Sequence, residues 1–123
     1  MKNVLIVEDS KAIRSLIRIA LEEEGGFFTS EANNGFEALK TLPSRKFDLI
    51  ITDINMPDIN GLELIGFVKS NQSYRAIPLI IVSTEKSEED KKRGMALGAM
   101  GYIVKPFRKE DLMALVMKAV GGK

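Results

Sequence analysis

Five short segments of the chain have the residue pattern of β-strands. Residues 4–7, 49–51, 79–82 and 102–104 are uninterrupted apolar runs rich in β-branched side chains. Strands that are buried on both faces of a sheet show this pattern. Residues 27–32 mix apolar and polar side chains, which is typical of an edge strand. The pattern therefore predicts four buried strands and one edge strand.

The segments that follow each strand carry apolar residues three or four positions apart, which is the spacing of one helix face. These positions are Ile13, Leu16, Ile17, Ala20 and Leu21 in the first predicted helix, Phe36, Leu39 and Leu42 in the second, Leu64, Phe67 and Val68 in the third, Met95 and Leu97 in the fourth, and Leu112, Leu115, Val116, Ala119 and Val120 in the fifth. Met113 and Met117 lie beside the fifth stripe. They either fill gaps in the core or form an adaptable contact surface with Tyr102.

Residues that start or stop helices agree with this assignment. Gly25-Gly26 ends the first helix, and the second begins near Asn34 and ends before Pro43. The third follows Gly61. The fourth is predicted to begin at Ser87, with Asp90 three residues later as a capping box, and to end near Gly98.

Strands and helices thus alternate five times along 123 residues. Alternation at this spacing predicts an α/β fold, with a doubly wound, five-stranded parallel sheet and five helices covering its two faces. No linker or low-complexity segment interrupts the pattern, so residues 1–123 are expected to form one domain.

Composition narrows the possible functions. The chain has neither Cys nor His, which excludes thiolate nucleophiles, zinc fingers and histidine-based triads. The net charge of +1 gives no reason to expect binding to nucleic acid or to an anionic membrane. The longest apolar run, residues 112–117, is too short for a transmembrane helix or a secretory signal. A cytoplasmic location is the expectation.

Polar residues follow four of the predicted strands where a parallel sheet binds its ligands, at the carboxyl ends. They are Glu8-Asp9, Asp53, Ser83-Thr84 and Lys105. Each alone has an ordinary explanation; Asp9, for example, could cap the first helix. Together, however, three carboxylates at one edge repel one another and need a cation, and oxygen ligands of this kind suit Mg²⁺.

The full set of motifs resembles the receiver domain of two-component response regulators, over essentially the whole chain. The matching residues are Glu8-Asp9, Asp53 with Met56-Pro57 and Gly61 behind it, Ser83, and Lys105-Pro106-Phe107. The resemblance implies a flavodoxin- or CheY-like fold with strand order 2-1-3-4-5. Ser83-Thr84-Glu85 and the run from Gly101 to Phe107 look most like single-domain receivers of the chemotaxis type.

The resemblance also implies roles for individual residues. Asp53 would be the phospho-acceptor. Glu8, Asp9, Asp53 and the backbone carbonyl of Asn55 would surround Mg²⁺, with Glu8 acting through water and Mn²⁺ as a substitute metal. Lys105 would contact the acyl phosphate and be joined to Pro106 by a cis peptide bond.

The remaining implied roles concern the switch. Ser83 would donate a hydrogen bond to the phosphoryl group, and Tyr102 falls at the family's aromatic switch position. Two features depart from the commonest pattern of the family. The first acid is Glu8 where Asp is frequent, and Ser83-Thr84 replaces a Thr followed by a small Ala.

Because the chain has no His, the phosphoryl donor is expected to be external, either a histidine kinase or a histidine phosphotransfer protein. The expected output is a conformational change of residues 83–93 and Tyr102. This change would expose the face of the fourth helix, fifth strand and fifth helix to a protein target, with chemotaxis as one pathway. We expect a monomer that catalyses only its own phosphorylation and dephosphorylation.

Four alternatives remain open. A Mg²⁺-dependent phosphatase or phosphotransferase with an aspartyl nucleophile would have a second Asp two residues after Asp53, where this chain has Asn55. A flavodoxin-like nucleotide-binding domain would have a phosphate loop in place of Glu8-Asp9. A scaffold domain of the same fold would not need the intact acids, hydroxyl and Lys. A phosphorelay intermediate would have the same residues as a regulator of a motor.

Overall fold

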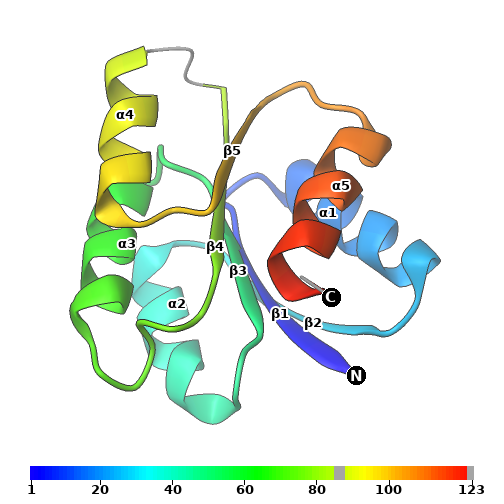
Figure 1. The fold of residues 1–123 in the computed structure, drawn as a ribbon, viewed down its shortest axis with the longest axis horizontal. Helices are drawn as coiled ribbons and strands as arrows, with labels where there is room; N and C mark the ends of the chain where they lie inside the picture. Colours follow the sequence, from blue (N-terminus) through cyan, green and yellow to red (C-terminus); the bar gives the residue numbers. More distant parts are fainter. Residues whose placement is uncertain (85–87, 122–123) are drawn as a thin grey trace.

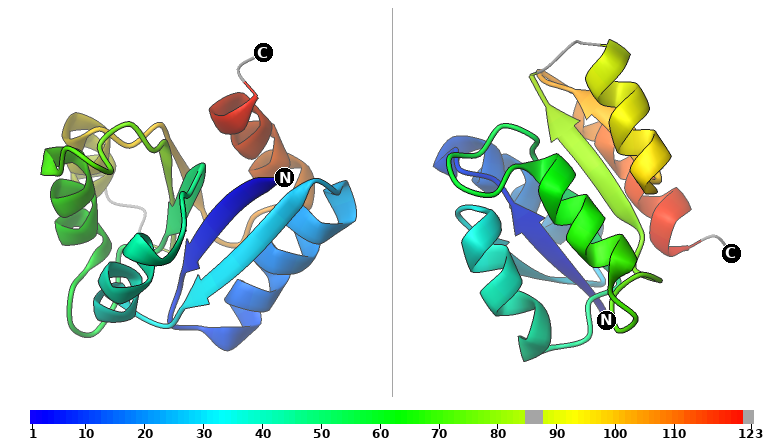
Figure 2. Two further views of the ribbon diagram at one scale, coloured as in Figure 1. Left: turned by 90° about the horizontal axis from the view of Figure 1, so that it is seen from below. Right: turned by 90° about the vertical axis from the view of Figure 1, so that its left-hand side faces the viewer.

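Five parallel strands form one sheet in the order β2-β1-β3-β4-β5, as a computed structural model shows. The structure describes residues 1–84 and 88–121. Helices α2, α3 and α4 cover one face, whereas α1 and α5 cover the other (Figure 1). Figure 2 shows β1 and β2 running side by side in the same direction, and α2, α3 and α4 lying next to one another. The predicted fold class and strand order are confirmed.

The elements lie close to their predicted positions. In chain order they are β1 (Lys2–Val7), α1 (Lys11–Glu24), β2 (Phe27–Ala32), α2 (Gly35–Thr41), a short 3₁₀ turn η1 (Leu42–Ser44), β3 (Leu49–Thr52), α3 (Gly61–Ser70), β4 (Leu79–Ser83), α4 (Glu88–Leu97), β5 (Gly101–Val104) and α5 (Lys109–Val120). The prediction that α4 begins at Ser87 concerns a residue outside those described. Within the described part of the chain, no helix is long and apolar enough to cross a lipid bilayer.

Alternate residues of the strands divide the core into two clusters. Leu5 and Val7 of β1 pack toward α2 and α3, while Val4 and Ile6 pack toward α1 and α5. β1, β3 and β4 are buried on both faces because helices cover the sheet on each side. β5 lies at the free edge, and three of its four residues are only half-buried, so its prediction as a fully buried strand was wrong.

Side-chain caps fix where three helices begin. Ser10, Asn34 and Asn60 each accept a hydrogen bond from the backbone N–H three residues later. At Asn60 the Glu63 side chain also accepts from the backbone N–H of Asn60, which completes a capping box. The ordinary explanation of Asp9 as the cap of the first helix is therefore wrong, because Ser10 fills that position.

Several predicted apolar contacts were wrong. Leu16, Phe36 and Phe67 are exposed, although they lie at helical spacing from core residues. Met95 and Leu97 do not anchor α4, since each is 41% exposed. Of the residues of α4, all of which the structure describes, only Gly94 is buried. A Cβ atom there would lie 2.4 Å from Cδ1 of Ile81, so the absent side chain lets α4 approach β4 closely.

The two methionines of α5 do not form one surface. Met113 is buried in the cluster beneath α1 and α5, whereas Met117 is exposed. Tyr102 packs against the other cluster, on the opposite face of the sheet. Met113 therefore fills the core, and the surface that would combine it with Tyr102 is not formed.

Candidate functional site

Three carboxyl groups meet at the carboxyl edge of the sheet. Glu8 and Asp9 follow β1, and Asp53 follows the neighbouring strand β3. One oxygen atom from each of the three lies within 4.8 Å of the others. Glu8 and Asp53 are buried, and Asp9 faces solvent. Three carboxylate oxygens at this spacing, with one side open to water, fit a hard divalent cation such as Mg²⁺.

Lys105 brings a cationic side chain to this site. Its Nζ lies 2.9 Å from Oε1 of Glu8 and 3.5 Å from Oδ2 of Asp53, and the side chain is only 9% exposed. The peptide bond from Lys105 to Pro106 is cis. Among the residues that the structure describes, one ammonium group faces three carboxyl groups, so these four side chains carry a net negative charge when all of them are ionised.

Burial dominates the titration of the two inner acids. Removal from water raises the pKa of Glu8, opposed by the hydrogen bonds from Lys105 and from the backbone of Ser10. Burial likewise raises the pKa of Asp53, opposed by the charge of Lys105 and by backbone N–H donors. A raised pKa means that ionisation of Glu8 and of Asp53 is less favourable here than in water, and nearby positive charge would favour it.

Backbone contacts hold Asp53 in place. Its N–H donates to the carbonyl of Val7, and its Oδ1 accepts from the N–H of Ile54 at 2.8 Å. The loop then returns to the strand end, where the N–H of Gly61 donates to the carbonyl of Ile54. A Cβ atom at Gly61 would lie 2.2 Å from the backbone oxygen of Asp53, so only glycine allows α3 to begin so close to this carboxylate.

The remaining predicted site residues occupy neighbouring positions. Ser83 ends β4 and is fully buried, and its carbonyl accepts from the N–H of Lys105. Thr84 and Asn55 are exposed at the same edge. Tyr102 pairs with Ile81 across β4 and β5 and is half-buried. The structure thus brings Glu8, Asp9, Asp53 and Lys105 into direct proximity, with Ser83 at the end of the adjoining strand.

Sequence reasoning missed Arg14. It lies in the second turn of α1, and its guanidinium donates to the backbone carbonyl of Glu8. A polar residue between Ile13 and Ile17, beside the apolar stripe of α1, gave only a faint signal. Its partners are a backbone carbonyl and side chains of a distant strand and loop, which no spacing rule connects to it.

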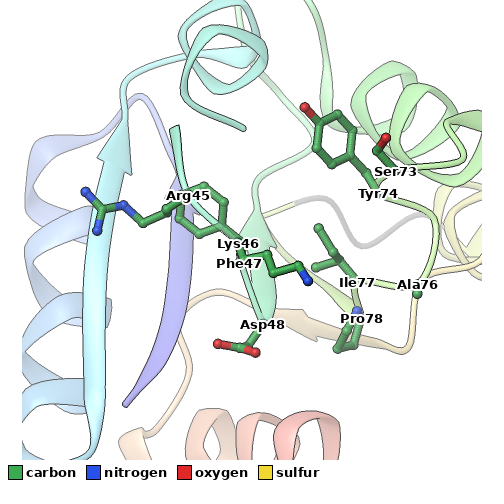
Figure 3. A pocket seen from close by; sticks show the side chains of 9 residues that line it. All are labelled: Arg45, Lys46, Phe47, Asp48, Ser73, Tyr74, Ala76, Ile77 and Pro78. Atoms are coloured by element: carbon green, nitrogen blue, oxygen red, sulfur yellow. The ribbon is translucent and has the colours of Figure 1, made fainter. Parts of the chain in front are cut away.

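A cavity of about 400 Å³ lies near the amino ends of the strands β3 and β4, away from the acid cluster at their carboxyl ends (Figure 3). Its lining comes from the segments before β3 and before β4, including Phe47, Tyr74 and Ile77. Arg45 extends away from the other lining residues in Figure 3, and its guanidinium lies 4.7 Å from the ring centroid of Phe28. The cavity lies apart from the acid cluster, because the two occupy opposite ends of the strands.

Comparison with known proteins agrees with this arrangement. A family model described as the response regulator receiver domain matches residues 4–117. The chain belongs to this family. Chemotaxis protein CheY of Pseudomonas aeruginosa is 33% identical over 115 residues, which cover 94% of this chain and 93% of that protein. The KDP operon transcriptional regulatory protein KdpE of Escherichia coli is 39% identical over 120 residues, or 98% of this chain and 52% of KdpE.

Two solved structures share the fold of this chain over nearly its whole length. Chemotaxis protein CheY4 of Vibrio cholerae has a TM-score of 0.89 and 37% identity, with coverage of 97% of this chain and 98% of that chain. The Mn²⁺-bound form of response regulator Rcp1 has a TM-score of 0.84 and 26% identity, covering 96% and 92%. The chain spans about half the length of three curated relatives that it matches. It is a receiver domain of the CheY type, a signalling domain of two-component systems.

Proposed function

We propose that this receiver accepts a phosphoryl group on Asp53 and signals through a change of conformation. The observation that carries the proposal is the placement of Asp53: a buried carboxylate at the end of β3, beside Glu8 and Asp9 and 3.5 Å from the ammonium group of Lys105. Phosphoryl transfer depends mainly on positioning and on neutralisation of charge, and this arrangement supplies both.

The transfer is a single displacement at phosphorus. An Oδ atom of Asp53 forms a P–O bond while the P–N bond to the donor's histidine breaks. The electron pair of the broken bond stays on the imidazole nitrogen, which takes up a proton from solvent. A small acyl phosphate reacts in the same way, with its carboxylate as the leaving group. Attack by water on phosphorus later releases inorganic phosphate and restores the Asp53 carboxylate. In this proposal the domain therefore catalyses only its own phosphorylation and dephosphorylation.

Mg²⁺, or Mn²⁺ in its place, would be held by Glu8, Asp9, Asp53 and the backbone carbonyl of Asn55. When bound, the ion supplies positive charge that offsets the negative charge gathered on the transferring phosphoryl group. The Lys105 ammonium contributes further positive charge from the protein side. Ser83 provides a hydroxyl at the end of β4 as a hydrogen-bond donor to the phosphoryl oxygens.

The output face would be formed by α4, β5 and α5. Gly94 is the one buried residue among those of α4, and helices with few buried contacts open at low free-energy cost. The hydrogen bond from the Lys105 N–H to the Ser83 carbonyl joins the ends of β5 and β4. A change at Ser83 or Lys105 therefore acts directly on the strand that carries Tyr102.

We expect acetyl phosphate, or a phosphorylated histidine kinase, to label the wild-type protein only when Mg²⁺ or Mn²⁺ is present. Labelling should saturate at one phosphoryl group per chain, because each domain has one acceptor. Mass spectrometry of the intact protein measures this stoichiometry. The same reaction distinguishes the alternative: steady turnover of phosphomonoesters would indicate a phosphatase, and rapid loss of the label to a second histidine protein would indicate a phosphorelay intermediate.

We also expect amide hydrogen exchange to change within residues 83–105 when beryllofluoride and Mg²⁺ are added as a phosphoryl mimic. The expected cause is a shift in a pre-existing equilibrium of α4 and β5. Exchange measured by mass spectrometry, with and without the mimic, tests this. Changes confined to α1 and α2, with residues 83–105 unaffected, would place the output face on the other side of the domain.

A further inference from the structure

Arg14 connects three separate segments at the acidic edge of the sheet. Its Nη1 donates to the backbone carbonyl of Glu8 at 2.8 Å and to Oδ1 of Asn33 at 2.9 Å. Its Nε pairs with Oε1 of Glu31 at 2.9 Å. The Arg14 side chain is only 15% exposed, unlike that of Arg18, which is 34% exposed. A guanidinium with three well-formed acceptors and little exposure is held in one orientation.

The carbonyl that Arg14 binds belongs to the residue that begins the acidic pair. The other polar groups of Glu8 are also engaged: its N–H donates to Ala32, its Oε2 accepts from the N–H of Ser10, and its Oε1 accepts from Lys105. Arg14 is thus the contact that ties the Glu8 backbone to α1 and, through Asn33, to the loop after β2.

We propose that Arg14 is a positioning residue for the metal-binding acids. It fixes the Glu8 carbonyl and so holds the turn from Glu8 to Ser10 in the geometry that places the Glu8 and Asp9 carboxylates beside Asp53. The inference rests on the proposed function, because it assumes that these acids bind a divalent cation. Arg14 touches neither the phosphoryl group nor the cation in this assignment, and it acts through the backbone that carries the acids.

An effect of charge alone would change the affinity for a divalent cation in the opposite direction, so the two explanations can be distinguished. Removal of a positive charge near a cluster of carboxylates favours cation binding by simple electrostatics. If Arg14 contributes only its charge, its replacement tightens the binding of a divalent cation. If Arg14 positions the acids, its replacement weakens binding, since loss of a hydrogen bond that orients metal ligands typically lowers affinity by about 10-fold to 100-fold.

Arg18 provides a matched control. It carries the same charge on the same helix and also pairs with Glu31, with its Nε 3.1 Å from Oε2. Its other ion-pair partner is Glu22, and among the described residues it makes no hydrogen bond to Glu8. Arg18→Met therefore removes the charge and the Glu31 contact but leaves the Glu8 carbonyl bound by Arg14.

The experiment measures the dissociation constant for Mn²⁺ by electron paramagnetic resonance of the free ion. Arg14→Met is expected to weaken Mn²⁺ binding by about 10-fold or more. Arg18→Met should leave binding unchanged or slightly tighter. Arg14→Lys keeps the charge but cannot hold three acceptors in the same plane, so we expect a smaller loss than for Arg14→Met.

Each outcome of these measurements supports or overturns the positioning role of Arg14. Circular dichroism first establishes that each variant is folded at the working temperature; if Arg14→Met is not, Arg14→Lys carries the test. Unchanged or tighter Mn²⁺ binding by the folded Arg14 variants would overturn the positioning role. An equal loss in Arg18→Met would assign the effect to Glu31 instead. Failure of the wild-type protein to bind Mn²⁺ would contradict the proposed function itself, which separates the two failures.

Discussion

Asp53→Asn is expected to abolish phosphoryl labelling completely while the domain stays folded. Asn places an amide where the carboxylate was, and a neutral amide does not displace the leaving group at phosphorus. Its side-chain oxygen still accepts from the N–H of Ile54, so the end of β3 keeps its local hydrogen bond. Incubation with acetyl phosphate and Mg²⁺, followed by mass spectrometry of the intact chain, measures the loss.

Asp58→Asn is the matched control for this substitution. Asp58 lies in the same loop and is exposed, and its Oδ1 accepts from the N–H of Ile59 just as that of Asp53 accepts from Ile54. Asp58 is outside the acid cluster, so its replacement should leave labelling intact. Undiminished labelling of Asp53→Asn would place the acceptor elsewhere and contradict the central proposal.

Much of this fold could be predicted because buried parallel strands have a distinctive composition. β1, β3 and β4 are covered on both faces, so each contains an uninterrupted run of three or four apolar residues. The mixed pattern of β2 likewise identified an edge strand. The acid cluster could be predicted for a related reason: polar residues directly after such strands must lie at one edge of the sheet, whatever the helices do.

The contacts of individual helix residues could not be predicted in the same way. Spacing shows that Leu16 and Phe67 lie near the apolar stripe, but not where that stripe ends. The contact of α4 with the sheet depends on a missing side chain at Gly94, whereas its apolar residues Met95 and Leu97 remain outside. A pattern of apolar residues cannot reveal a contact made by glycine.

The ion pairs inside the site could not be predicted from the sequence either. The Lys105 ammonium is nearer to Glu8, at 2.9 Å, than to Asp53, at 3.5 Å. Glu8 is one methylene longer than the Asp that is frequent at this position of the family, and its carboxylate reaches both Lys105 and the N–H of Ser10. The Lys105 ammonium is therefore shared unequally between the two acids, and Asp53 has the more distant contact.

This unequal sharing predicts a large effect on stability. In metal-free solution near neutral pH, Asp53→Asn is expected to raise the free energy of unfolding. The substitution removes a buried charge that repels its neighbours, while Lys105 keeps its closer partner Glu8. Glu8→Gln should stabilise less, because it deprives Lys105 of that partner. Urea unfolding monitored by circular dichroism, in the presence of a chelator, measures both effects.

The sign of the pH dependence follows from the direction of the shifts. Burial raises the pKa of Asp53 and of Glu8 in the folded state, so the folded state holds its protons to higher pH than the unfolded state. Each group then contributes stability that is fully present below its unfolded pKa and is lost as pH rises through its folded pKa. Each unit by which the pKa is raised corresponds to about 1.4 kcal/mol of stability lost in this way.

The difference in stability between Asp53→Asn and the wild-type protein should therefore grow with pH and then level off. It is expected to be small near pH 4 and to reach its plateau above the folded pKa of Asp53, while titrating groups far from the cluster cancel in the difference. Mg²⁺ should reduce this advantage, because it binds the folded wild-type protein and raises its melting temperature. Asp9→Ala should weaken that response to Mg²⁺. A stability difference that does not vary with pH would contradict the assignment of this cluster as an anionic site. A wild-type melting temperature that millimolar Mg²⁺ does not change would contradict its neutralisation by a divalent cation.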